Sequence, residues 1–168
     1  MKHQINSLLL PFFAFVLSLI CSPAFAQKEG WEFTSWDMKL AQVQDSLHDR
    51  QIEYTYLINN GKGGFLKITL ADYQSWVTDL FFSLESQFLF QVVSKKKFAN
   101  KDAQTATQTF EQLTDNFREI YGAPVKEAED STAPFCQFEY IWELERTKIT
   151  LTYCKTSTIS LTLVYAKR

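Results

Sequence analysis

The chain has little of what most catalytic and metal sites are built from. Its 168 residues include two histidines and three cysteines. No Cys-x-x-Cys pair, Asp-x-Asp-x-Asp loop or Gly-x-Ser-x-Gly elbow occurs in it. Zinc sites, calcium loops and serine hydrolases depend on such patterns. We therefore expect no catalytic site, no metal site and no cofactor, and a hydrolase is only the third functional hypothesis for this sequence.

Glycine, proline and surplus charge are also scarce. Five glycines and four prolines accompany an aromatic content of 15%, which is typical of a folded domain and not of a linker. The formal net charge of −2 provides no basic excess, so nucleic acid is not an expected partner. Only one long apolar run occurs, at the N-terminus. We therefore expect no transmembrane anchor in the mature protein.

This apolar run indicates export. It covers residues 8–20, follows the basic Lys2 and precedes a small-x-small motif at 24–26. Thirteen residues are too few to cross a bilayer comfortably. A basic start, an apolar run and a small-x-small motif together predict a signal peptide over residues 1–26.

Removal of the signal peptide would leave residues 27–168 as a single domain, large enough for one core. We expect this mature protein to be periplasmic or secreted. An alternative start is a lipid-modified Cys21, but the bulky Ile20 stands where a lipoprotein signal requires a small residue.

The two remaining cysteines are candidates for a disulfide. Cys136 and Cys154 lie symmetrically about residue 145, where a hairpin turn is expected, and paired cysteines are common in oxidising compartments. The apolar pattern places Trp142 opposite Ile149, which is one residue out of register with a Cys136–Cys154 pair. A β-bulge would have to reconcile the two registers.

Hydrophobic periodicity predicts two helices and seven strands. The helices are expected at 38–50 and 103–121. Gly122 and Pro124 follow the second helix as a stop signal. The apolar stripe of this helix consists of Ala106, Phe110, Leu113, Phe117 and Ile120. The strands are expected at 53–58, 65–70, 76–84, from 88 to the lysines at 95–97, 135–143, 148–154 and 158–165, with a polar loop at 126–134.

This pattern predicts an α+β fold. We expect a two-layer antiparallel sheet with two helices in the order α-ββββ-α-βββ, because the loops are short and the strands alternate in hydrophobicity. The order of helix and then strands occurs twice, which suggests an internal duplication.

Two short signatures carry a family resemblance. The first is a Trp-x-Met-x4-Val pattern, Trp36 to Val43, with Asp37 where glycine is expected, and the second is Tyr121-Gly122-Ala123-Pro124. With Trp142 and Tyr165 in later strands, the chain resembles small secreted bacterial domains of unknown function. The resemblance implies an α+β fold and no activity. In architecture alone, the chain is also similar to outer-membrane assembly lipoproteins and secreted enzyme-inhibitor domains.

Several polar residues could take part in chemistry but have a simpler explanation. His48, the only histidine of the expected mature chain, lies beside the apolar stripe of its helix and has no predicted nucleophile near it. Three carboxylates, Glu139, Glu143 and Glu145, could form a glycosidase pair, but the pattern indicates an exposed polar strand face.

Three segments could bind ions. The acidic residues Glu127, Glu129 and Asp130 could hold calcium, Gly61–Gly64 could approach a phosphate, and Lys95–Lys97 could contact an anionic surface. The favoured interpretations are solvated loop charge, a flexible hairpin turn and charges that protect a strand from aggregation.

Aromatic and apolar residues are the more promising binding groups. Trp31, Phe33 and Trp36 crowd a segment without clear alternation, and Phe81 and Leu89 lie opposite the main apolar rows of their strands. These five could form an exposed patch, or the segment could pack over the core. We expect a non-catalytic binding module that contacts another envelope protein. The alternative is a carrier that holds a small apolar, lipid-like ligand between sheet and helices.

We predict that the exported protein begins at Gln27, with this residue either free or cyclised. The small-x-small motif at 24–26 places signal-peptidase cleavage there. Intact-mass measurement of the exported protein checks this. A retained Met1 or a lipidated Cys21 would contradict the prediction.

Overall fold

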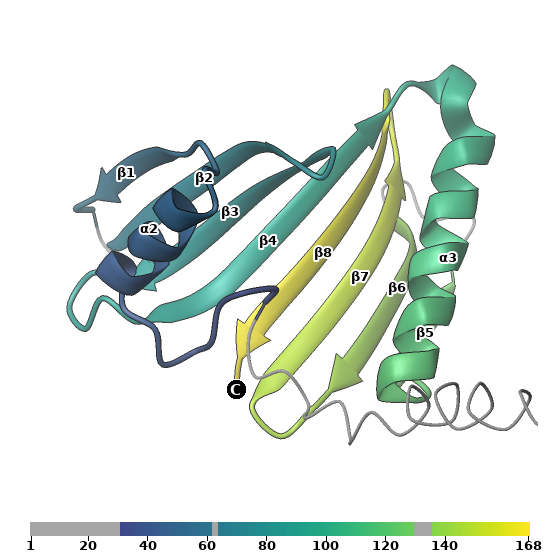
Figure 1. Ribbon diagram of the computed structural model, residues 1–168. Helices are drawn as coiled ribbons and strands as arrows, with labels where there is room; N and C mark the ends of the chain where they lie inside the picture. Colours follow the sequence, from purple (N-terminus) through teal and green to yellow (C-terminus); the bar gives the residue numbers. More distant parts are fainter. Residues whose placement is uncertain (1–30, 62–63, 130–135) are drawn as a thin grey trace, which may run out of the picture.

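The computed structural model describes residues 31–61, 64–129 and 136–168 (Figure 1). The elements in chain order are α2 (Leu40–Asp49), β1 (Thr55–Asn59), β2 (Phe65–Tyr73), β3 (Trp76–Ser83), β4 (Leu89–Phe98), the short 3-10 turn η1 (Asn100–Asp102), α3 (Ala103–Tyr121), β5 (Lys126–Glu129), β6 (Cys136–Glu143), β7 (Thr147–Lys155) and β8 (Ile159–Lys167).

All strands described form one antiparallel sheet in the order β1-β2-β3-β4-β8-β7-β6-β5. The predicted α+β class is confirmed. Each half of the described part of the chain consists of a helix followed by four consecutive strands, and the halves join where β4 pairs with β8.

The predicted order of three strands after the second helix is wrong. The segment expected to be an acidic loop contains β5, which pairs with β6 at the sheet edge. Its sequence, Lys-Glu-Ala-Glu, has no apolar alternation that would indicate a strand. It joins the sheet through backbone pairing, to which polar side chains are no obstacle at an edge.

The strand register builds one continuous buried face. Directly paired residues in an antiparallel sheet point to the same side. A chain of such pairs crosses the sheet through Trp142, Ile149, Tyr165, Val92, Leu80 and Ile68, all of which are buried. Both helices lie over this same face (Figure 1).

Helix α2 closes the core over the first half of the sheet. Its buried residues Leu40, Val43 and Leu47 follow the spacing expected for one helix face. The helix is fixed to the sheet at its start, where Lys39 forms a β-bridge with Phe88.

Helix α3 covers the second half of the sheet with a stripe that differs from the predicted one. Ala106, Phe110, Thr114 and Phe117 are buried, whereas Ile120, expected to be in the stripe, is 55% exposed. The Thr114 hydroxyl donates a hydrogen bond to the Phe110 carbonyl (2.9 Å), so it can be buried with its polar group satisfied.

The end of α3 is anchored by the second sequence signature. Gly122 has φ +80°, a conformation that glycine adopts without strain. Its carbonyl accepts a hydrogen bond from the indole N–H of Trp142 (3.0 Å). The glycine therefore both ends the helix and fixes the direction of a core tryptophan on β6.

A β-bulge determines which residues of β4 enter the core. The register shifts so that Leu89 pairs with Phe82 and Gln91 pairs with Phe81, with Phe90 extra between them. As a result Leu89 is fully buried while Phe88 and Phe90 are exposed. The sequence predicted the reverse for these residues, because simple alternation from Val92 does not include an inserted residue.

A second bulge accommodates the two cysteines. Trp142 pairs with Ile149, Cys136 pairs with Cys154, and the register shifts between Cys136 and Phe138. A disulfide joins Cys136 and Cys154, with a Cα–Cα distance of 3.9 Å. The bulge that was needed to reconcile the two registers is therefore present.

We predict that Phe117→Ala destabilises the protein by about 3–5 kcal/mol. The ring is buried and meets Trp142 edge-on at a centroid distance of 5.3 Å, so truncation leaves a cavity. The control is Ile120→Ala on the exposed side of the same helix, which should change the free energy of unfolding by less than about 0.5 kcal/mol. Urea unfolding of both variants checks this, and equal midpoints would show that α3 does not close the core.

Candidate functional site

The side of the sheet opposite the two helices, here called the open face, has no described element over it. The register places the alternate residues of each strand there: Lys67 and Thr69 on β2, Asp79 and Phe81 on β3, Val93 and Lys95 on β4, Glu139 and Ile141 on β6, Thr150 and Thr152 on β7, and Thr162 and Val164 on β8. An exposed antiparallel sheet is usually polar on its wet side. This one is mixed.

Three rings form a contiguous group at the first half of the open face. Phe65 on β2 meets Phe81 on β3 edge-on at 5.3 Å between centroids, and Phe81 lies 6.4 Å from Phe90 on β4. We call these residues the phenylalanine row. Phe90 is 39% exposed, and the β4 bulge is what places it there. Adjacent aromatic side chains of this kind are enriched at the centres of protein interfaces.

A neutralised charge pair borders the phenylalanine row. Lys67 lies directly opposite Phe81 in the sheet, and its ammonium is 3.3 Å from the Asp79 carboxylate. The Thr69 hydroxyl donates to the same carboxylate at 2.5 Å. The polar groups beside the rings are thus already paired with each other, and no net charge faces the row from this side.

The carboxylates considered for glycosidase chemistry are engaged in surface ion pairs. Glu139 bonds to Lys126, and Glu143 lies 3.3 Å from Arg168. Glu145 is exposed in the turn after β6. Hydrolysis requires one carboxyl kept protonated by burial and another kept ionised, and nothing around these three residues creates that difference.

The five residues of the predicted aromatic patch do not form one surface. Trp31, Trp36 and Leu89 are in the core. Trp36 donates a buried hydrogen bond from its indole N–H to the Thr147 hydroxyl (2.8 Å), which holds the N-terminal aromatic segment against β7. Phe33 lies beside Trp31 and beneath the Arg50 guanidinium, which is 4.8 Å from the ring centroid.

Of these five residues, Phe81 alone belongs to the open face. Its neighbours Phe65 and Phe90 were not among the candidate residues. Phe65 could have been found, because it precedes Leu66, Ile68 and Leu70 on the opposite side of its strand. Phe90 could not, because its side depends on the bulge.

The three consecutive lysines do not form one basic patch. They lie within β4, which continues to Phe98, so alternate residues point to opposite sides. Lys95 and Lys97 are on the open face, whereas Lys96 is on the other face, with its ammonium 5.9 Å from the Trp76 ring centroid and 5.7 Å from that of Phe98. Two of the three lysines therefore lie on the open face, and the third lies on the helix-covered face.

The acidic residues proposed for calcium already have partners. Glu127 accepts a hydrogen bond from Arg118 (2.9 Å), and Glu129 accepts one from the Tyr140 hydroxyl (2.6 Å). Asp130 lies outside the described residues, as do Lys62 and Gly63 of the glycine turn. Among residues 31–61, 64–129 and 136–168, no group of three histidine, cysteine or acidic side chains is placed to hold a metal. His48 is exposed on α2.

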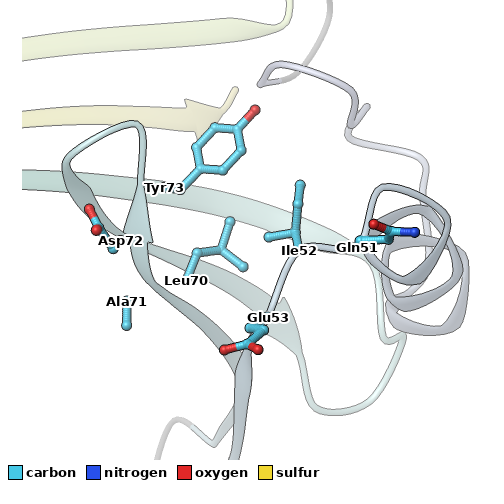
Figure 2. A pocket seen from close by; sticks show the side chains of 7 residues that line it. All are labelled: Gln51, Ile52, Glu53, Leu70, Ala71, Asp72 and Tyr73. Carbon is cyan, nitrogen blue, oxygen red and sulfur yellow. The ribbon is translucent and has the colours of Figure 1, made fainter.

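Figure 2 shows one hollow of the helix-covered side, about 340 Å³ in volume, between the turn after α2 and the end of β2. Ile52, Leu70 and Tyr73 gather at its centre, and the carboxylates of Glu53 and Asp72 lie on separate sides. The two acids are therefore not arranged as a catalytic pair.

A second hollow, about 170 Å³, lies between the helix α3 and the N-terminal aromatic segment. Trp31, Tyr73, Phe117, Leu163 and Tyr165 are among its lining residues. It is largely apolar and contains the edge of the buried Tyr165, whose pKa is raised by burial. Its size is that of a single small ring and falls below the usual range of ligand pockets.

Comparison with known proteins gives no relative: the chain matches no family profile, no characterised protein and no solved structure. Within the described part of the chain, neither helix is long and apolar enough to cross a membrane.

We predict that the tyrosine on β6 makes stability fall at high pH. Burial, followed by the hydrogen bond to Glu129, raises the pKa of Tyr140 to about 12, from 10.0. Because the folded protein keeps the proton longer than the unfolded chain, this contribution is complete below pH 10 and is lost as pH rises through about 12.

The check compares the parent with Tyr140→Phe by urea unfolding at increasing pH. The free-energy difference between them should stay constant at neutral and mildly alkaline pH and should shrink above pH 10. A difference that stays flat into that range would contradict the assignment.

Proposed function

We propose that this chain is a non-catalytic binding module that acts outside the cytoplasm and contacts another envelope protein through its open face. The observation that carries the proposal is the phenylalanine row, three adjoining rings on a sheet face that neither helix covers. Burial of a large aromatic side chain gives a protein partner a strong anchor.

The surroundings of the row favour a protein over other partners. Beside the rings, the ammonium of Lys67 is paired with the carboxylate of Asp79, so this part of the border is polar and carries no net charge. An apolar centre with a polar rim is the usual arrangement of a protein interface. A nucleic acid or an anionic membrane would instead require a concentrated basic surface.

The export signal predicted at residues 1–26 gives the location in this proposal. An envelope or secreted setting is consistent with a Cys136–Cys154 disulfide, since disulfides persist in oxidising compartments. The partner would then be another protein of the same compartment.

A second candidate function rests on the hollow beside Tyr165. A small apolar ligand could enter between Trp31 and Phe117, which would make the protein a carrier. The volume of about 170 Å³ accommodates one ring and not an acyl chain. Native mass spectrometry of the purified protein distinguishes the two functions, because a carrier would retain a small-molecule adduct of constant mass.

We predict that position 90 contacts a partner in the cell. A photoreactive phenylalanine analogue at position 90 should yield one discrete protein adduct on illumination, because Phe90 projects from the open face. The matched control places the same analogue at position 120 on α3, an exposed apolar position on the other side of the molecule. Adducts from neither position, or the same adduct from both, would contradict the proposal.

With the adduct identified, binding can be measured on purified proteins. Phe81→Asp should weaken binding by about thirtyfold or more, as expected when the centre of an interface is lost. Ile120→Asp should leave binding unchanged. If the two variants bind equally well, the phenylalanine row is not the contact surface.

A further inference from the structure

The two edges of the sheet differ in chemistry. β5, at one edge, has the sequence Lys-Glu-Ala-Glu, and its charged side chains bond to Glu139, Arg118 and Tyr140. Charged residues of this kind protect an edge strand from pairing with another chain. β1, at the other edge, has the sequence Thr-Tyr-Leu-Ile-Asn. It carries no charge and no proline, and none of the described strands pairs with its outer side.

The side chains of β1 are also exposed to an unusual degree for their type. Tyr56, Leu57 and Ile58 are 42%, 50% and 52% exposed. Tyr56 and Ile58 point to the helix-covered face, since they pair with the core residues Ile68 and Leu66, but both remain exposed there. An uncharged apolar edge strand is a template for strand addition.

The sequence of β1 is complementary to itself. If two copies pair antiparallel about Leu57, Tyr56 of each copy lies opposite Ile58 of the other, and Thr55 lies opposite Asn59. Aromatic and β-branched residues form favourable cross-strand pairs. A two-fold axis brings like residues together, so the lack of charge in β1 removes the repulsion that such symmetry would otherwise impose.

The nearest charge on the open face does not prevent this pairing. Lys67 lies beside Leu57 in the sheet, but its ammonium is neutralised by Asp79 at 3.3 Å. Lys67 therefore brings no unpaired charge to the two-fold axis.

We propose that β1 pairs with β1 of a second copy of this chain, forming a symmetric dimer with one continuous sheet across both subunits. The axis of such a dimer is perpendicular to the sheet, so both open faces lie on the same side and both pairs of helices lie on the other. The exposed Tyr56 and Ile58 of each copy gain contacts with the other copy. The inference rests on the sheet edge and does not depend on the proposed partner of the phenylalanine row.

Sedimentation of the purified protein over a wide concentration range tests the dimer. The parent should associate reversibly to a dimer. Leu57→Lys, which sets two ammonium groups against each other at the axis, should raise the dimer dissociation constant by about tenfold or more. The control Ile120→Lys adds the same charge at a position of similar exposure on α3 and should leave the constant unchanged.

A charge-swap experiment separates loss of pairing from loss of folding. Leu57→Lys and Leu57→Glu should each dimerise about tenfold or more weakly than the parent when alone, and their mixture should form a tighter heterodimer, because opposite charges then meet across the axis. A parent that stays monomeric, a Leu57→Lys variant that dimerises like the parent, or a mixture that does not associate would each overturn the proposal.

Discussion

The rest of the structure depends on one constraint: side chains of residues that pair directly across the sheet point to the same side of it. Because directly paired residues point to the same side, the paired core residues from Trp142 to Ile68 form a single apolar surface, although they come from six strands. Large side chains gain about 1.5–3 kcal/mol each from full burial, so a register slip that turned one strand over would forfeit several such contributions at once. Both helices are placed where this surface requires a cover.

The bulges in β4 and β6 are two of the points at which the pairing register shifts by one residue; a third shift lies between Leu70 and Tyr73 of β2. At β4 the extra residue keeps Leu89 in the core and turns Phe90 to the open face. At β6 the shift turns Cys136 to the side of Cys154, while Phe138 stays with the rings under α3. Each bulge therefore places a side chain that regular alternation would have put elsewhere, one for a surface and one for a covalent link.

Local periodicity encodes the class of fold and both helices, whereas tertiary context decides the features that the sequence did not predict. The α+β class, both helices and the position of Gly122 as a helix end follow from periodicity and stop signals. The burial of Thr114 in place of Ile120 does not, because the tilt of a helix over its sheet selects between neighbouring stripes. β5 has no apolar pattern and exists because β6 offers an unpaired edge.

The candidate site was only partly predictable for the same reason: Phe81 follows from alternation, whereas Phe90 depends on a bulge that no short motif indicates.

Burial on one face leaves the molecule with two kinds of unused surface, and they differ in what they can bind. The open face offers side chains, with the phenylalanine row as its apolar centre, so it selects a partner by shape and by the pairing of polar groups around the rings. The β1 edge offers backbone donors and acceptors, which any extended strand can satisfy, so its selectivity must come from the side chains that flank them. Tyr56, Leu57 and Ile58 match their own sequence in reverse, and a second copy is the partner for which no further recognition is needed.

Pairing at the β1 edge would double the open face without altering it, because the strands that carry Phe65, Phe81 and Phe90 are not at the edge. A dimer built in this way would present two phenylalanine rows on one side, and a partner with two matching sites would gain avidity from that geometry alone.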